Sequence, residues 1–410
     1  MKNEESSGGV TAPAGFTAGG FRCGFKSSRA ANDTALIVSR VPCTAAAVFT
    51  ENLVKAEPVK LSAQHVAGGK AQAVIANAGN ANACTGAQGR KNALRMARAV
   101  AGALSVPEEE VLVCSTGVIG QQFPETALET LEKNAAGFCA ALSREGHTAA
   151  REAILTTDTV YKESEIRFEL DGRTVTIGAM AKGSGMIHIN MGTMLAFVTT
   201  DCAISAEMLD CALRESAACT YNCVSVDGDT STNDTLLILA NGLAGNTPVT
   251  EKNAAYGKFL QALTELNTVM ARKIAADGEG ATRLVECLVT GAASGEAART
   301  LAKSVVSSNL VKAAFYGRDA NWGRILCALG YSGVPFSPES VRVSFRSAAG
   351  EIAVCENGMP LPFDEQKASS VLDRPEVLVL VDLGGGNGTG RAWGCDLTCE
   401  YVRINGDYRS

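Results

Sequence analysis

Histidine is scarce in this sequence of 410 residues, which contains only three: His65, His147 and His188. A hydrolase built on a serine–histidine pair therefore has few candidate bases, and a histidine-rich zinc site is disfavoured. The fourteen cysteines include no CxxC pair, which favours buried, reduced thiols over metal ligands or disulfides. We therefore expect no metal site and a cytoplasmic location.

Signals for secretion, membrane insertion and nucleic-acid binding are also missing. The N-terminal stretch MKNEESSGGVTAPAGF has no apolar core, and no apolar run reaches the length of a transmembrane helix. The net charge is -6, whereas binding to a phosphate backbone needs clustered lysine and arginine. The sequence has no GxSxG elbow and no P-loop. We expect no membrane or nucleic-acid partner, but a local cationic site could still bind a small anion.

Short apolar runs and helical segments alternate irregularly along the chain. Residues 164–180 predict a hairpin that turns at Asp171-Gly172. The glycine-rich run 382–394 does not match a dinucleotide-binding fingerprint and predicts a loop between strands. Strands that come in runs, with helices between them, indicate a layered α+β fold. Further strands are expected at 36–40, 45–50, 71–76, 110–114, 235–240 and 398–405, and helices at 90–104, 124–138 and 251–274.

One stretch, AKGSGMIHINMGTMLAFVTTD (181–201), offers a nucleophile that needs no histidine. If the bond before Thr193 is cut, the new α-amino group, with an unperturbed pKa of about 8, can take the proton of the same residue's hydroxyl. Gly192 has no Cβ, so the backbone can adopt the strained shape that brings the hydroxyl to its upstream carbonyl. The alternative is that Gly192-Thr193 is merely a junction between a loop and a buried strand.

Cleavage and acyl transfer both pass through a tetrahedral intermediate, whose oxyanion needs hydrogen-bond donors. The run VLVCSTGVIG offers the hydroxyl of Thr116 and the backbone N–H of Gly117 directly after an apolar strand. Ser-Thr-Gly is also a common turn, so this motif alone does not decide the function.

Taken together, the motifs resemble those of the ornithine acetyltransferases (glutamate N-acetyltransferases, ArgJ) of arginine biosynthesis. The resemblance runs nearly end to end. It includes VTAPAGFTAGGFRCGFK, NAGNANACTG, STGVIG, ILTTDT, AKGSGMIHINMGTMLAFVTTD, SVDGDTSTNDT, DGEGATRLVE, GRDANWGRI and the terminal NGDYRS.

The resemblance implies that the precursor cuts itself at Gly192/Thr193 into an α chain (1–192) and a β chain (193–410). The new N-terminal Thr193 would then take an acetyl group from N-acetylornithine and pass it to glutamate. Thr116 and Gly117 match the family's oxyanion-hole pair. The substrate-binding positions carry over to Thr159, Lys182, Thr193, Glu279, Asn405 and Ser410.

The implied roles agree with the charges. Lys182 suits the α-carboxylate that donor and acceptor share, and Glu279 suits the side-chain ammonium of ornithine. We expect the tail after Asn405 to order against both residues. The resemblance further implies a four-layer αββα sandwich of the kind found in DmpA and ArgJ, and α2β2 assembly. It implies no cofactor and leaves open acetyl-CoA as a second acetyl donor.

The sequence departs from the family pattern at a few positions. Ile189 and Gly192 replace a common proline and alanine beside the cleavage site, and Arg409-Ser410 replaces a terminal threonine pair. These changes bear on the rate of self-cleavage and on the contacts of the tail.

Two other functions compete with the transferase: an N-terminal-nucleophile amidohydrolase or aminopeptidase of the same fold, and a non-catalytic protein that binds a small anion.

Overall fold

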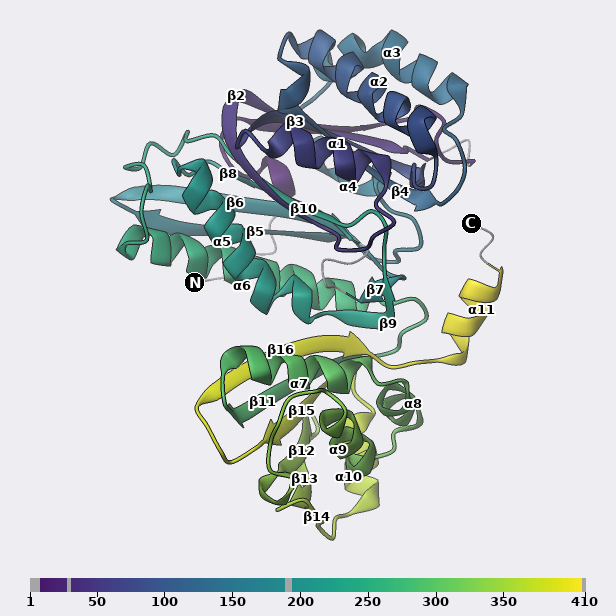
Figure 1. Cartoon of the computed structure of the whole chain (residues 1–410), viewed down its shortest axis with the longest axis vertical. Helices are drawn as coiled ribbons and strands as arrows, with labels where there is room; N and C mark the ends of the chain where they lie inside the picture. The colour runs from purple at the N-terminus through teal and green to yellow at the C-terminus, as the bar shows by residue number, and fades with distance from the viewer. Residues whose placement is uncertain (1–7, 28–30, 189–193, 408–410) are drawn as a thin grey trace.

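The computed structural model describes residues 8–27, 31–188 and 194–407, which form two layered bodies (Figure 1). The upper body in Figure 1 is built on an eight-stranded sheet, and the lower body on a six-stranded sheet. A two-stranded ribbon of β7 (Ile187–His188) and β9 (Ser225–Thr230) lies on the side of the upper body that faces the lower one. An isolated bridge between Val224 and Trp393 helps to join the two bodies.

The eight-stranded sheet has the order β4-β3-β2-β10-β8-β6-β5, with β1 paired to β2. The sequence predicts two short strands at 36–40 and 45–50, whereas the structure has one long strand, β2, that spans both. Its register with β3 shifts between Val38 and Cys43, so β2 passes from one half of the sheet to the other. The strands are β1 (Phe16–Phe21), β2 (Thr34–Phe49), β3 (Lys70–Asn80), β4 (Val111–Val118), β5 (Lys162–Leu170), β6 (Arg173–Lys182), β8 (Leu195–Thr200) and β10 (Thr235–Ala240).

The two halves of this sheet pack against each other, with helices outside each half. Ile37 and Val74 of one half share a core with Phe197 and Leu237 of the other, whereas Leu36 faces the first helical layer. The result is the expected four-layer αββα sandwich, which confirms the predicted α+β fold. The first helical layer is α1 (Glu57–Val66), α2 (Gly86–Leu104) and α3 (Glu125–Ala140), the second is α5 (Ala206–Cys219) and α6 (Ala254–Ala276), and α4 (His147–Ala153) packs on β1.

The smaller body has the strand order β14-β13-β12-β15-β11-β16, with helices α7 to α10 packed on one face (Figure 1). Its apolar residues continue the core under α5 and α6. The strands are β11 (Leu284–Ala292), β12 (Arg342–Ser347), β13 (Gly350–Glu356), β14 (Met359–Pro360), β15 (Glu376–Asp382) and β16 (Gly388–Cys395). The helices are α7 (Gly295–Ser307), α8 (Asn309–Gly317), α9 (Trp322–Gly330) and α10 (Glu365–Leu372).

The predicted hairpin is present, since Asp171 and Gly172 both have positive φ, of 51° and 73°, between β5 and β6. The prediction of a strand at 398–405 is wrong, because α11 (Cys399–Asp407) occupies this segment and projects from the body (Figure 1). The hydroxyl of Thr398 accepts a hydrogen bond from the backbone N–H of Glu400 at 3.2 Å. This is a helix cap that the sequence analysis missed.

The predicted fragments 1–192 and 193–410 interleave within the large sheet. β10 and β8, which follow residue 193, lie between β2 and β6, which precede it. The backbone therefore forms strand-to-strand hydrogen bonds across the predicted division. Residues 189–193, which contain the division itself, lie outside the described part of the chain. None of the helices in the described ranges is long and apolar enough to span a membrane.

Candidate active site

A cavity of about 280 Å³ lies beside the ends of β4 and β6, the loop before β10, and α11. Its walls come from segments far apart in the sequence. Five of the lining residues are predicted site residues: Thr116, Gly117, Lys182, Glu279 and Asn405. The others are Ala81, Ile119, Thr156, Thr157, Gly185, Met186, Ser231, Thr232 and Asn233. The predicted residues Gly192, Thr193 and Ser410 lie outside the described part of the chain.

Thr116 and Gly117 lie near the end of β4, where pairing with β3 becomes irregular at Gly79 and Asn80. Gly117 has a φ of 131°, and an added Cβ would lie 2.3 Å from the carbonyl carbon of Gly79. Because a side chain would be strained and would clash with β3, this position requires glycine. Both the Thr116 side chain and the Gly117 backbone therefore line a wall that the sheet itself holds in place.

Lys182 ends β6 and is buried, with its Nζ 3.4 Å from the hydroxyl oxygen of Thr116, to which it donates. The same ammonium lies 3.9 Å from Asp158 Oδ2. Burial lowers the pKa of Lys182, and the carboxylate of Asp158 opposes this effect. A buried cation at a cavity wall attracts anions strongly, because it is poorly screened by water.

Glu279 and Asn405 also line the cavity. Asn405 Nδ2 donates a hydrogen bond of 2.8 Å to Glu279 Oε2, which ties α11 to the cavity. The Glu279 carboxyl group packs directly against Gly185, where an added Cβ would lie 2.4 Å from it. Asn405 thus contacts the site, whereas the expected ordering of the tail after it stays a prediction, because residues 408–410 lie outside the described ranges.

Thr159 is the one predicted residue that the structure describes away from the cavity. Its side chain is exposed, and its hydroxyl donates a hydrogen bond to Asp277. Two other threonines of the same ILTTDT motif, Thr156 and Thr157, line the cavity instead. Within this motif, Thr156 and Thr157 therefore face the cavity and Thr159 does not, and the substrate-binding role predicted for Thr159 has no support from its position.

The loop before β10 adds groups that the sequence analysis missed. Asn233 Nδ2 donates to the carbonyl oxygens of Ala81 and Ser115, at 2.6 and 2.8 Å. Asp234 Oδ1 accepts the backbone N–H of Met194 at 2.6 Å. Burial raises the pKa of Asp234 well above its usual range, although the Met194 N–H and the Lys182 ammonium oppose this. The residue that follows Thr193 is thus held beside the cavity by a buried carboxyl group.

The three histidines are engaged elsewhere and are not among the residues that line the described cavity. His147 contacts Glu163 at 3.1 Å, and His65 contacts the carbonyl oxygen of Val111 at 2.9 Å. His188 contacts Ser225 at 3.0 Å, and burial together with Lys303 lowers its pKa to about 4. His188 is therefore neutral near pH 7.

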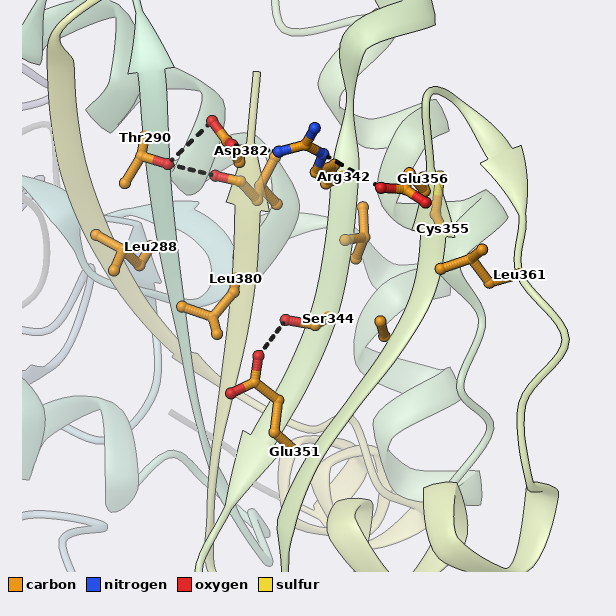
Figure 2. Close-up of a pocket in the computed structure, with 13 residues that line it drawn as sticks. Leu288, Thr290, Arg342, Ser344, Glu351, Cys355, Glu356, Leu361, Leu380 and Asp382 are labelled. Carbon is orange, nitrogen blue, oxygen red and sulfur yellow. Dashed lines mark hydrogen bonds and ion pairs between the residues drawn. The ribbon is translucent and has the colours of Figure 1, made fainter. Parts of the chain in front are cut away.

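A second hollow, of about 360 Å³, opens on the face of the six-stranded sheet opposite its helices (Figure 2). Its charged side chains are paired with one another. Arg342 lies between Asp382 and Glu356, at 3.7 and 3.6 Å, and Ser344 donates to Glu351 at 3.0 Å. The predicted residues lie in the other cavity, which we therefore take as the candidate active site.

Comparison with known proteins identifies the family of the chain. The model of the ArgJ family matches residues 17–410. The arginine biosynthesis bifunctional protein ArgJ of Symbiobacterium thermophilum is 52% identical over 98% of this chain and 99% of its own length. The protein of the same name from Thermotoga neapolitana is 48% identical over 97% and 99%. A solved ArgJ chain from Bacillus halodurans is 46% identical, with a TM-score of 0.50 over 53% of this chain and 100% of its own.

Proposed function

This chain belongs to the ArgJ family and is an acetyltransferase of arginine biosynthesis, and we propose that it moves acetyl from N-acetylornithine to glutamate through an ester on Thr193. The observation that carries the proposal is the composition of one cavity. A buried cation, Lys182, and a carboxylate, Glu279, line it together with the Thr116-Gly117 pair. These groups match a donor with an α-carboxylate at one end, an ammonium at the other, and an acetyl carbonyl between them.

The first step in this scheme is self-cleavage. The Thr193 hydroxyl attacks the carbonyl carbon of Gly192, the peptide C–N bond breaks, and the resulting ester is hydrolysed by water. The products are the Gly192 carboxylate and a free amine on Thr193. Two observations support a stable cut product. The fragments interleave in one sheet, and the solved Bacillus halodurans chain matches just over half of this one over its full length.

Acetyl transfer then follows in two halves. The Thr193 amine takes the hydroxyl proton, and the oxygen attacks the acetyl carbonyl of N-acetylornithine. The Thr116 hydroxyl and the Gly117 N–H bind the oxyanion, and ornithine leaves after its nitrogen takes the proton. The amine of glutamate next attacks the acetyl ester, which yields N-acetylglutamate and restores the Thr193 hydroxyl. Lys182 binds the α-carboxylate in both halves, so one site serves donor and acceptor.

Subunit assembly into α2β2 and the use of acetyl-CoA as a second donor remain predictions. The relatives are named bifunctional, which agrees with two acetyl donors. Assaying glutamate acetylation with acetyl-CoA alone tests the second donor, and light scattering of the purified protein tests the assembly.

The main test combines a denaturing gel, N-terminal sequencing and product analysis. We expect two fragments, one of which begins Thr-Met-Leu-Ala-Phe, and N-acetylglutamate from N-acetylornithine plus glutamate. Thr193→Ala should stay uncut and inactive, whereas Thr130→Ala, at a partly exposed site on α3 outside the cavity lining, should behave as wild type. Release of acetate without N-acetylglutamate would indicate the amidohydrolase. A single uncut band without turnover would indicate the binding protein.

A further inference from the structure

Lys162, at the start of β5, carries a fully buried ammonium outside the cavity lining. Its Nζ donates to Asp158 Oδ1 at 2.7 Å and to Asp277 Oδ2 at 2.5 Å. A third contact, of 3.4 Å, reaches the carbonyl oxygen of Val160. The two carboxylates come from loops that are more than a hundred residues apart in the sequence, so Lys162 joins distant segments.

The Asp158 side of this cluster leads to Lys182. Asp158 Oδ1 also accepts the backbone N–H of Gly183 at 2.7 Å, and its Oδ2 lies 3.9 Å from the Lys182 ammonium. Oδ2 also accepts the backbone N–H of Thr156 at 3.2 Å. Asp158 therefore fixes both the side chain of Lys182 and the backbone that follows it.

The Asp277 side leads to Glu279. The carbonyl oxygen of Asp277 accepts the hydroxyl of Ser184 at 2.7 Å, and the backbone N–H of Glu279 donates to the carbonyl oxygen of Ser184 at 3.1 Å. Gly185 then packs against the Glu279 carboxyl group. The loop that carries Glu279 is thus bound both to Lys162 and to the loop that follows Lys182.

Charge balance makes this cluster sensitive to the loss of any member. The side chains of Lys162, Lys182, Asp158 and Asp277 are nearly or fully buried. Burial would raise the pKa of Asp158, but Lys182 and Lys162 outweigh it and lower the pKa to about 2. Without Lys162, two buried carboxylates would share the remaining cation, Lys182, and draw it away from the cavity.

We propose that Lys162 is a positioning residue that sets the separation of Lys182 and Glu279, and thereby the selectivity for acetyl donors that carry both an α-carboxylate and a side-chain ammonium. This inference rests on the proposed function. Lys162 acts through Asp158 and Asp277 and touches no substrate. A purely structural role would lower the amount of folded enzyme but would leave the choice between donors unchanged.

The test compares two donors, N-acetylornithine and N-acetylnorvaline, which has the same carbon chain without the ammonium. The ratio of their kcat/KM values does not depend on the amount of folded enzyme. We expect a ratio of at least about 100 for wild type, because norvaline offers the Glu279 carboxylate no ammonium to pair with. In Lys162→Met the ratio should fall below about 10, mainly through a higher KM for N-acetylornithine.

Lys312→Met is the matched control. Lys312 is another buried lysine, on α8, whose ammonium donates to the carbonyl oxygen of Cys395 at 2.6 Å. This control should melt at a lower temperature and keep the wild-type ratio. If it lowers the ratio as much as Lys162→Met does, loss of any buried lysine explains the effect and the inference is wrong.

A second variant covers the case in which Lys162→Met does not fold. Asp277→Asn keeps the shape of the side chain and removes one carboxylate that holds Lys162, and it should also lower the ratio below about 10. If a folded Lys162→Met or Asp277→Asn enzyme keeps the wild-type ratio, the inference about Lys162 is wrong and the proposed function is unaffected. If the wild-type enzyme transfers no acetyl group, or does not discriminate between the two donors, both the proposed function and this inference are wrong.

Discussion

Replacing Thr116 with valine exchanges its hydroxyl for a methyl group of similar size and leaves the end of β4 intact. Both side chains are β-branched and suit a strand, and the site is almost closed to solvent, with Thr116 6% exposed. The change therefore removes one proposed oxyanion donor with little disturbance of the cavity wall. It also removes the acceptor for Lys182, but that contact is long, at 3.4 Å.

The two losses differ in size. A hydrogen bond from a charged group contributes about 1.5–3 kcal/mol to the free energy of unfolding, and the long Lys182 contact belongs at the lower end of that range. Removing one donor from an oxyanion hole lowers kcat by about 10²–10³, or about 2.7–4 kcal/mol in the activation barrier. The Lys182 ammonium remains beside the same wall and stabilises part of the developing charge, so we expect the lower end of this range. KM for N-acetylornithine should change little, because the oxyanion forms only in the transition state.

Steady-state transfer from N-acetylornithine to glutamate measures the effect, with the fraction of self-cleaved protein determined first. In the proposed scheme, self-cleavage uses the same oxyanion hydrogen-bond donors as acetyl transfer. Incomplete cleavage must therefore be distinguished from slow acetyl transfer by the cleaved enzyme. Thr116→Ser keeps a hydroxyl and should retain kcat within a few-fold. A Thr116→Val enzyme that is fully cut and keeps more than a tenth of wild-type kcat would contradict the assigned role.

Two further predictions concern the same wall and the buried charges behind it. Gly117→Ala should lower kcat at least as much as Thr116→Val and should destabilise the fold by about 1–3 kcal/mol through its positive φ. Gly137→Ala, on the exposed side of α3 with nothing within 4 Å, should stabilise it slightly, and urea unfolding compares the two. Because the pKa of Asp158 is lowered to about 2, its stabilising effect should be complete above about pH 4 and disappear as the pH falls towards 2. Urea unfolding of wild type and Asp158→Asn at pH 7, 4 and 2.5 should therefore show a difference that shrinks with acid, and a constant difference would contradict this.

Local patterns were enough to predict much of the fold. The turn at Asp171-Gly172 and the strand 235–240 follow from residue types that favour these conformations, and both are present. The prediction of a strand at 398–405 was wrong because the β-branched and aromatic residues of this segment follow a helix cap, Thr398. The sequence also does not show whether a sheet edge is available for this segment to pair with. The single long strand β2 was also missed, because Arg40, Val41 and Pro42 interrupt the apolar pattern, whereas in the structure the strand continues across a shift in its register with β3 between Val38 and Cys43.

The candidate site shows the same division between local and long-range information. Thr116, Lys182 and Glu279 were predicted from their motifs, and the fold brings them to one cavity. Thr159 lies away from the cavity, because a motif shows which residues occur together but not the side of the loop on which each side chain lies. Lys162 could not be predicted from a motif, because its role depends on contacts with Asp158 and Asp277. These two residues are far apart in the sequence and are brought together only by the fold.

The strand order also explains how a cut at the proposed place can leave a rigid nucleophile. The pairing of β8 with β6 and β10 begins at Leu195, so breaking the bond before Thr193 removes none of these ladder hydrogen bonds. Met194 is held separately, because its N–H donates to Asp234 and its carbonyl oxygen accepts the N–H of Thr235. A new amino terminus at Thr193 would therefore be positioned by its neighbours in the sheet. In the proposed scheme, the preorganisation that catalysis requires would come from strands on both sides of the cut, and the covalent link before Thr193 would not be needed for it.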